Sequence, residues 1–153
     1  MKSVLNISDL PSRTGSGYPA DYAKEVQGRS NVALGNAFDL TQFGANITTL
    51  QPGAWSSQRH WHLNEDELII VLEGEMLIVD DAGRHPFNTG QVAGFKANTP
   101  NAHVVVNESN KPAKFLVIGT RAKTEAAYYP DIDMHYLRDE QGPRFTRKDG
   151  SSF

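Results

Sequence analysis

The chain has 153 residues, of which 39% are hydrophobic and 22% are charged, and this length fits one domain with a single core. The net charge is −3, so the composition does not favour a nucleic-acid partner. There is no cysteine, which excludes a disulfide framework, an iron–sulfur cluster and a thiol nucleophile, and leaves histidine and carboxylate as ligands for any metal.

Residues 1–40 are predicted to form an N-terminal arm and a first edge strand. The stretch up to about Asn31 is rich in serine, glycine, proline and charged residues (PSRTGSGYP, then ADYAKEVQGRS), which is typical of irregular structure. One short helix is expected over residues 20–26. No segment has the apolar length of a signal peptide or of a membrane span, so we expect a cytoplasmic protein with no membrane partner.

Residues 41–120 carry a series of short strand patterns separated by turn residues. Turns are expected at Pro52-Gly53, at Glu73-Gly74 and at the Asp-Asp-Ala-Gly tip over residues 80–83. No helical period of useful length occurs in this part of the chain. The expected strands are residues 44–50, 58–62, 67–72, 75–79, 91–95, 102–107 and 114–120. Many short strands with frequent turns favour an all-β sandwich or closed barrel.

Residues 121–153 are expected to form a C-terminal strand and a tail packed on the barrel, so that the whole chain is a single domain. The density of apolar residues falls after Arg121. Residues 128–137 (YYPDIDMHYL) predict one further edge strand. Residues 142–153 are polar and are expected to lie over the surface.

Two histidines separated by one residue carry the first chemical signal. His60, Trp61 and His62 lie in a strand-like segment. Residues i and i+2 of a strand point to the same face, so both imidazoles are expected to face inward and Trp61 outward. Glu67 follows a short polar reversal and opens the neighbouring strand, within reach of both histidines. His103 begins a later apolar strand and is the candidate for a fourth ligand.

Three imidazoles and one carboxylate suit a divalent transition ion such as Zn, Fe, Mn, Ni or Co better than Ca or Mg. We therefore predict a site for one such ion on His60, His62, Glu67 and His103. The alternative is a metal-free barrel in which these four side chains are packed and hydrogen-bonded.

The same residues resemble the two sequence motifs of the cupin superfamily. The first motif is matched by Gly53, His60, His62, Glu67 and Gly74, and the second by Gly90, His103 and Asn107. The resemblance implies a double-stranded β-helix, which is the cupin or jelly-roll barrel. It also assigns metal ligation to His60, His62, Glu67 and His103.

Departures from the cupin motifs lie in loops and bear on the shape of the pocket mouth. The spacing from Gly53 to His60 is longer than usual, and Lys96 and Asn98 stand where proline and glycine are common. Beyond the motifs, nearly the whole chain is similar to a subgroup of small bacterial single-domain cupins, in segments such as VLEGE, GFKANTPNAHVVVN and FTRKDGSSF. Some members of that subgroup are labelled sugar-phosphate isomerases.

Three functions are open for such a site. The first is a metal-dependent enzyme of isomerase or epimerase type, acting on a small oxygenated metabolite such as a sugar phosphate. The second is an iron-dependent dioxygenase, since flavonol-cleaving cupins also use three histidines and a glutamate. The third is a non-catalytic module that binds a small molecule. The complete ligand set favours catalysis, but the sequence identifies no general base or other catalytic residue.

Other polar and aromatic residues predict no further site. His85 in a polar turn and His135 in the C-terminal region are expected at the surface or in packing, and Arg59 is expected to be structural or interfacial. Several residues could face the pocket without a signal that singles one out; they are Gln42, Asn46, Trp55, Gln58, Lys96 and Arg121.

We also expect a homodimer, because small barrels of this kind expose strand edges that are commonly covered by a second copy. The N-terminal arm and the segment YYPDIDMHY are suited to covering or exchanging such edges.

Overall fold

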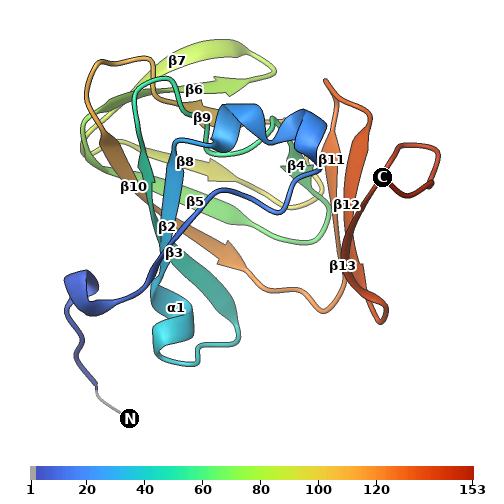
Figure 1. Cartoon of the computed structure of the whole chain (residues 1–153), viewed down its shortest axis with the longest axis horizontal. Helices are drawn as coiled ribbons and strands as arrows, with labels where there is room; N and C mark the ends of the chain where they lie inside the picture. The colour runs from blue at the N-terminus through green and yellow to red at the C-terminus, as the bar shows by residue number, and fades with distance from the viewer. Residues whose placement is uncertain (1–2) are drawn as a thin grey trace.

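The computed structural model describes residues 3–153, and its regular secondary structure is mostly β-strand (Figure 1). Its helical segments are short: η1 Ile7–Asp9, η2 Ala20–Tyr22, η3 Lys24–Val26 and α1 Leu34–Ala37. No helix within the described residues is long and apolar enough to cross a membrane.

The strands pair antiparallel in three sheets. The first sheet has the order β1-β2-β3-β10-β5-β8, the second β7-β6-β9 and the third β13-β12-β11-β4. The strands of the first sheet are β1 Ser12–Thr14, β2 Arg29–Ala33, β3 Phe43–Leu50, β5 Glu67–Glu73, β8 Val92–Phe95 and β10 Ala113–Thr120. The others are β4 Trp61–His62, β6 Glu75–Asp80, β7 Gly83–Asn88, β9 Val104–Val106, β11 Glu125–Tyr129, β12 Met134–Asp139 and β13 Gly142–Thr146.

The main core lies between the first and second sheets. Strand β5 shows the alternation that places it there, because Ile69 and Val71 are buried while Leu68 and Leu72 are exposed. Side chains from both sheets form one cluster; its buried members are Leu50, Ala54, Ile69, Val71, Met76, Ile78, Phe87, Val105, Ala113 and Phe115. This arrangement confirms the predicted all-β, double-stranded β-helix fold.

The C-terminal region differs from its prediction. The sequence predicts one edge strand over residues 128–137 and a surface tail after it. The structure instead has β11 and β12 joined by a turn, with β13 added beyond β12. The turn begins at Pro130, which divides the predicted strand, and Gly142 starts β13 with a φ of 92°, a backbone conformation that glycine adopts without strain.

The N-terminal arm is also more regular than its composition suggests. Strands β1 and β2 extend the first sheet along β3, although the sequence predicts irregular structure up to Asn31. The arm then covers the third sheet, where Tyr18 and Tyr22 pack against Ala127, Tyr129 and Met134. The arm therefore extends the first sheet at its edge and covers apolar residues of the third sheet.

Residues 83–88, which the sequence analysis leaves as a loop after the hairpin tip, form strand β7. Its residues other than Phe87 are largely polar or exposed, and it contains Pro86, a residue tolerated at a sheet edge. His85 lies in this strand, is exposed, and contacts Asp80 at 3.0 Å.

Charged residues outside the barrel link separate loops. Arg59 pairs with Asp81 of the β6–β7 tip and with Asp131 of the β11–β12 turn, so its role is structural.

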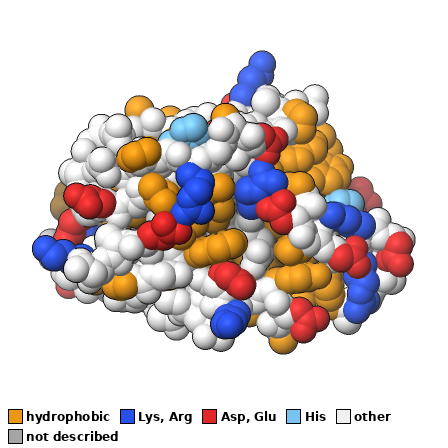
Figure 2. Space-filling view, turned by 90° about the horizontal axis from the view of Figure 1, so that it is seen from above, with side chains coloured by type: hydrophobic (Ala, Val, Ile, Leu, Met, Phe, Trp, Pro, Cys, Tyr) orange, Lys and Arg blue, Asp and Glu red, His pale blue; other side chains and the backbone are white. Residues whose placement is uncertain are grey.

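Asn98 has a φ of 57°, which explains why glycine is common at this position. Acidic and basic side chains are interspersed on the face shown in Figure 2, and this face has no continuous patch of one charge.

Candidate metal centre

The four predicted ligands line one cavity of about 270 Å³. His60 is the residue before β4, His62 is the last residue of β4, Glu67 is the first residue of β5, and His103 is the residue before β9. The structure thus brings together residues that are up to 43 positions apart in the chain (103 − 60 = 43).

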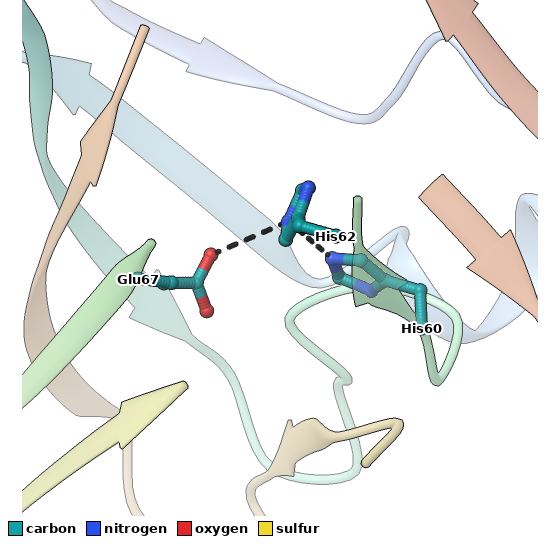
Figure 3. Close-up of side chains that lie close together, drawn as sticks. All are labelled: His60, His62 and Glu67. Carbon is teal, nitrogen blue, oxygen red and sulfur yellow. Dashed lines mark hydrogen bonds and ion pairs between the residues drawn. The ribbon is translucent and has the colours of Figure 1, made fainter. Parts of the chain in front are cut away.

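Their donor atoms converge closely. The Nε2 atoms of His60 and His62 are 3.1 Å apart. An oxygen of Glu67 lies 2.9 Å from His103 Nε2, and the other lies 3.8 Å from His62 Nε2. Figure 3 shows Glu67 reaching toward the two histidines from the opposite strand. The ligand atoms of His60, His62 and Glu67 all lie within 4.8 Å of one another, so these three could share one ion. His103 is not in this group, and its Nε2 instead hydrogen-bonds Glu67.

Backbone pairing fixes the histidines. His60 and His103 exchange two backbone hydrogen bonds, at 3.1 and 2.8 Å, and form an isolated bridge that sets their rings on the same side. His62 pairs with Ala127 of β11. Glu67 lies in β5 of the first sheet rather than in a strand paired with β4, so it approaches the histidines from across the cavity.

Aromatic rings hold two of the imidazoles in place. Phe95 stacks on His103 with ring centroids 3.5 Å apart, and Tyr129 stacks on His60 at 5.4 Å. Trp61 points away from the cavity and stacks on Tyr128 at 4.6 Å, as its strand phase predicts. Rings that are clamped in this way lose little entropy when they bind a ligand.

The protonation of His60 favours ligation. Its Nδ1 lies 2.8 Å from the carbonyl oxygen of Gln58, which can only accept, so Nδ1 carries the proton and the Nε2 lone pair faces the cluster. Burial lowers the pKa of His60 to about 3, with further lowering by His62 and His103. The imidazole is therefore neutral at physiological pH, as a metal ligand must be.

Glu67 is ionised in the same cavity. Burial acts to raise its pKa, but the hydrogen bond from His103 and the electrostatic influence of the three histidines outweigh burial and bring the pKa to about 2. Imidazole and carboxylate groups are the donors that a divalent transition ion prefers. The residues present therefore fit such an ion.

A second cluster adjoins the first on the other side of His62. Its members, His62, Glu65 and Glu125, also lie close enough to surround an ion. However, Glu125 already accepts backbone hydrogen bonds from Leu63, Asn64 and Ala126. Glu65 accepts from the backbone of Ala122 and from Arg138. We therefore interpret these carboxylates as a support for the loop that carries His62.

Glu125 also faces the unused nitrogen of His62. The Nδ1 atom of His62 is buried without a hydrogen-bond partner, and it lies 3.9 Å from a Glu125 oxygen. A histidine that binds a metal through one nitrogen commonly donates from the other nitrogen to a carboxylate. Glu125 is placed to accept that proton after a small movement.

The cavity also has a polar wall that is not predicted from the sequence. That wall comes from the arm, β2, β3 and the loop before β4; its residues are Tyr18, Arg29, Asn31, Thr48, Ser56 and Ser57. Arg29 and Asn31 alternate in β2, and this period of two is the signal that could have been used. The other candidates do not line this cavity; they are Gln42, Asn46, Trp55, Gln58, Lys96 and Arg121.

Comparison with known proteins identifies the family. Residues 46–119 match the cupin domain family. A protein from Silicibacter pomeroyi, described as a sugar phosphate isomerase from a cupin superfamily, is 47% identical and superposes with a TM-score of 0.94 over 98% of this chain and 96% of that chain. The chain belongs to the cupin superfamily.

Other solved structures are similar to this cupin at lower identity. A protein from Acidithiobacillus ferrooxidans, provisionally described as a sugar phosphate isomerase, is 26% identical with a TM-score of 0.74, over 82% of this chain and 80% of that chain. The polyketide cyclase of Streptomyces resistomycificus is 19% identical with a TM-score of 0.65, over 78% and 80%, and shows the fold alone. No curated protein matches the sequence.

Proposed function

We propose that this cupin is a metal-dependent isomerase of a small sugar phosphate, with one divalent transition ion held by His60, His62, Glu67 and His103. The observation that carries the proposal is the convergence of three imidazoles and one carboxylate on one cavity. The Silicibacter pomeroyi protein described as a sugar phosphate isomerase supports the choice of reaction.

A bound divalent ion would polarise a substrate carbonyl or hydroxyl and stabilise the negative charge that develops when an adjacent C–H proton is removed. The cavity supplies the groups that handle protons. Glu67 is the one carboxylate among the described residues that line it, and it would have to leave the ion to receive that proton. The hydroxyl groups of Tyr18 and Ser57 can orient substrate oxygens by hydrogen bonds.

Deuterium exchange tests this reaction class. The protein, loaded with one equivalent of Mn, Zn, Ni or Fe, is incubated with aldose and ketose phosphates in D2O. We expect metal-dependent incorporation of deuterium at the carbon next to the carbonyl, because the proton removed from that carbon exchanges with solvent. The loss of its proton NMR signal measures the exchange. Chelator-treated protein is the control and should give no exchange.

Failure of every sugar phosphate to exchange with every metal would contradict the isomerase. Oxygen consumption by the iron-loaded protein with flavonol substrates would instead favour a dioxygenase.

A further inference from the structure

We propose that Arg29 forms a subsite for the oxyanion group, phosphate or carboxylate, of the ligand that reaches the metal cluster. The inference rests on the proposed function and deepens it, since it gives the ligand an anionic end and places that end at β2. Arg29 would contact the oxyanion group of the ligand, at a distance from the reacting atoms.

The Arg29 guanidinium has no acidic partner within the described residues. Its Nη1 donates to the carbonyl of Ser56 at 2.5 Å, and its Nη2 donates to the carbonyl of Gly15 at 3.0 Å. Both acceptors are neutral. Its Nε is buried and has no hydrogen-bond partner. No ion pair among residues 3–153 includes this side chain, whereas Arg59, Arg84, Arg138 and Arg144 each have a carboxylate partner.

Arg29 is partly buried, and a charge that is partly removed from water without an opposite charge is costly. Burial lowers the pKa of Arg29, which reflects this lack of compensation, although a guanidinium remains protonated. Glu67 is the one acidic side chain among the described residues that line the cavity, and the charge of a divalent ion would exceed the negative charge of its carboxylate. The cavity is therefore suited to a ligand that carries negative charge.

Arg29 stands where three cavities meet. It lines the cavity of the four candidate ligands, a cavity of about 800 Å³ under the N-terminal arm, and one of about 250 Å³ beside Tyr129 and Tyr136. Asn31, two residues along β2, shares the first two. A ligand with one end at His60 and Glu67 can therefore extend past Arg29 toward the arm.

Neutral donors surround the same position. Tyrosine hydroxyl groups are protonated at neutral pH, and the oxygens of Tyr18 and Tyr129 are 3.5 Å apart. Tyr18 also accepts from the backbone N–H of Gln58 at 3.3 Å. Its own proton can therefore be given to an oxyanion held by the guanidinium. Arginine with added hydroxyl donors is a common way to bind phosphate or carboxylate.

Binding of inorganic phosphate to metal-free protein tests the subsite. Chelation removes any ion through which phosphate could bind, and chloride keeps the ionic strength constant. We expect the Arg29 Nε–H signal in a ¹H–¹⁵N NMR spectrum, assigned by its loss in Arg29→Lys, to shift saturably with phosphate. Arg29→Gln should weaken phosphate binding by about 10- to 100-fold. A parallel titration with acetate distinguishes a phosphate subsite from a carboxylate subsite.

Arg144→Gln is the matched control, because Arg144 pairs with Asp139 at the surface, and its phosphate binding should equal that of the wild type. Arg29→Gln also removes two hydrogen bonds to the backbone, so the wild-type titration keeps the test valid if that variant does not fold. An Arg29 signal that phosphate and acetate leave unchanged would overturn the inference, as would equal affinities of the wild type and Arg29→Gln.

The outcomes that contradict the proposed function differ from those that contradict the anion subsite. Phosphate binding at Arg29 in a protein that takes up no metal would contradict the metal-dependent isomerase and leave the anion subsite intact. Deuterium exchange by a protein that binds no anion at Arg29 would support the isomerase and overturn the anion subsite.

Discussion

Replacing His62 with alanine is expected to lower the affinity for a divalent transition ion by at least about 100-fold, because loss of a direct ligand should cost no less than loss of a supporting residue. The Nε2 atom of His62 lies between His60 and Glu67, at 3.1 and 3.8 Å, so its removal opens the centre of the cluster. Competition titration against a metal-binding dye measures the affinity directly. The variant should also lose the increase in melting temperature that bound metal gives the wild type.

His85→Ala is the matched control for this experiment. His85 is exposed and contacts Asp80 on β6, outside the cavity, so its removal should leave metal affinity unchanged. A His62→Ala variant that binds one equivalent as tightly as the wild type would exclude His62 from the ligand set.

Replacing Glu125 with alanine is expected to lower the free energy of unfolding of the metal-free protein by about 3 kcal/mol, because buried N–H groups lose their acceptor. The carboxylate is fully buried and accepts from the backbone of Leu63, Asn64 and Ala126, at 2.9 to 3.2 Å. These bonds hold the loop that follows His62 against the start of β11. Urea denaturation of metal-free protein measures the loss.

Glu125→Gln separates the two roles of this residue. The glutamine oxygen can still accept from the loop, so we expect this variant to be much more stable than Glu125→Ala. Its metal affinity should nevertheless fall by about 10-fold or more, since a neutral amide supports the Nδ1 proton of His62 less well than a carboxylate. Equal stability of the two variants would contradict the structural role, and wild-type metal affinity in Glu125→Gln would contradict the orienting role.

The central part of the fold could be predicted from the sequence because its strands bury one face and expose the other. The alternation in β5, with Ile69 and Val71 inward, is visible in the sequence itself. The phase of His60 and His62 could be predicted for the same reason, since a period of two places both rings on one face. The positions of Glu67 and His103 around them came from the cupin resemblance and from their places at strand starts.

The number and bounds of the peripheral strands could not be predicted because their stability comes from contacts that are distant in sequence. Strand β2 is held by its pairing with β3, and its polar residue Arg29 faces a cavity rather than solvent. Strand β7 contains Pro86 and three exposed neighbours, and only its pairing with β6 makes it a strand. The third sheet depends on Tyr18 and Tyr22 of the arm, which lie over 100 residues before β11, β12 and β13 (125 − 22 = 103).

The polar side of the site was missed for a related reason. A composition rich in serine, glycine and charge predicts an irregular arm and no site residue, although Arg29, Asn31 and Tyr18 of that region line the cavity. Whether a polar residue near a strand faces solvent or a cavity depends on what packs over it, and this is decided by the tertiary fold.

The most direct test of the account is the metal content of the protein, purified without an affinity tag and without added metal and measured by elemental analysis. We predict about one equivalent of a divalent transition ion per chain in the wild type, and a much smaller amount in His62→Ala. A folded wild-type protein that contains no such ion, and takes none up when Zn, Mn, Fe or Ni is supplied, would contradict the proposed metal centre.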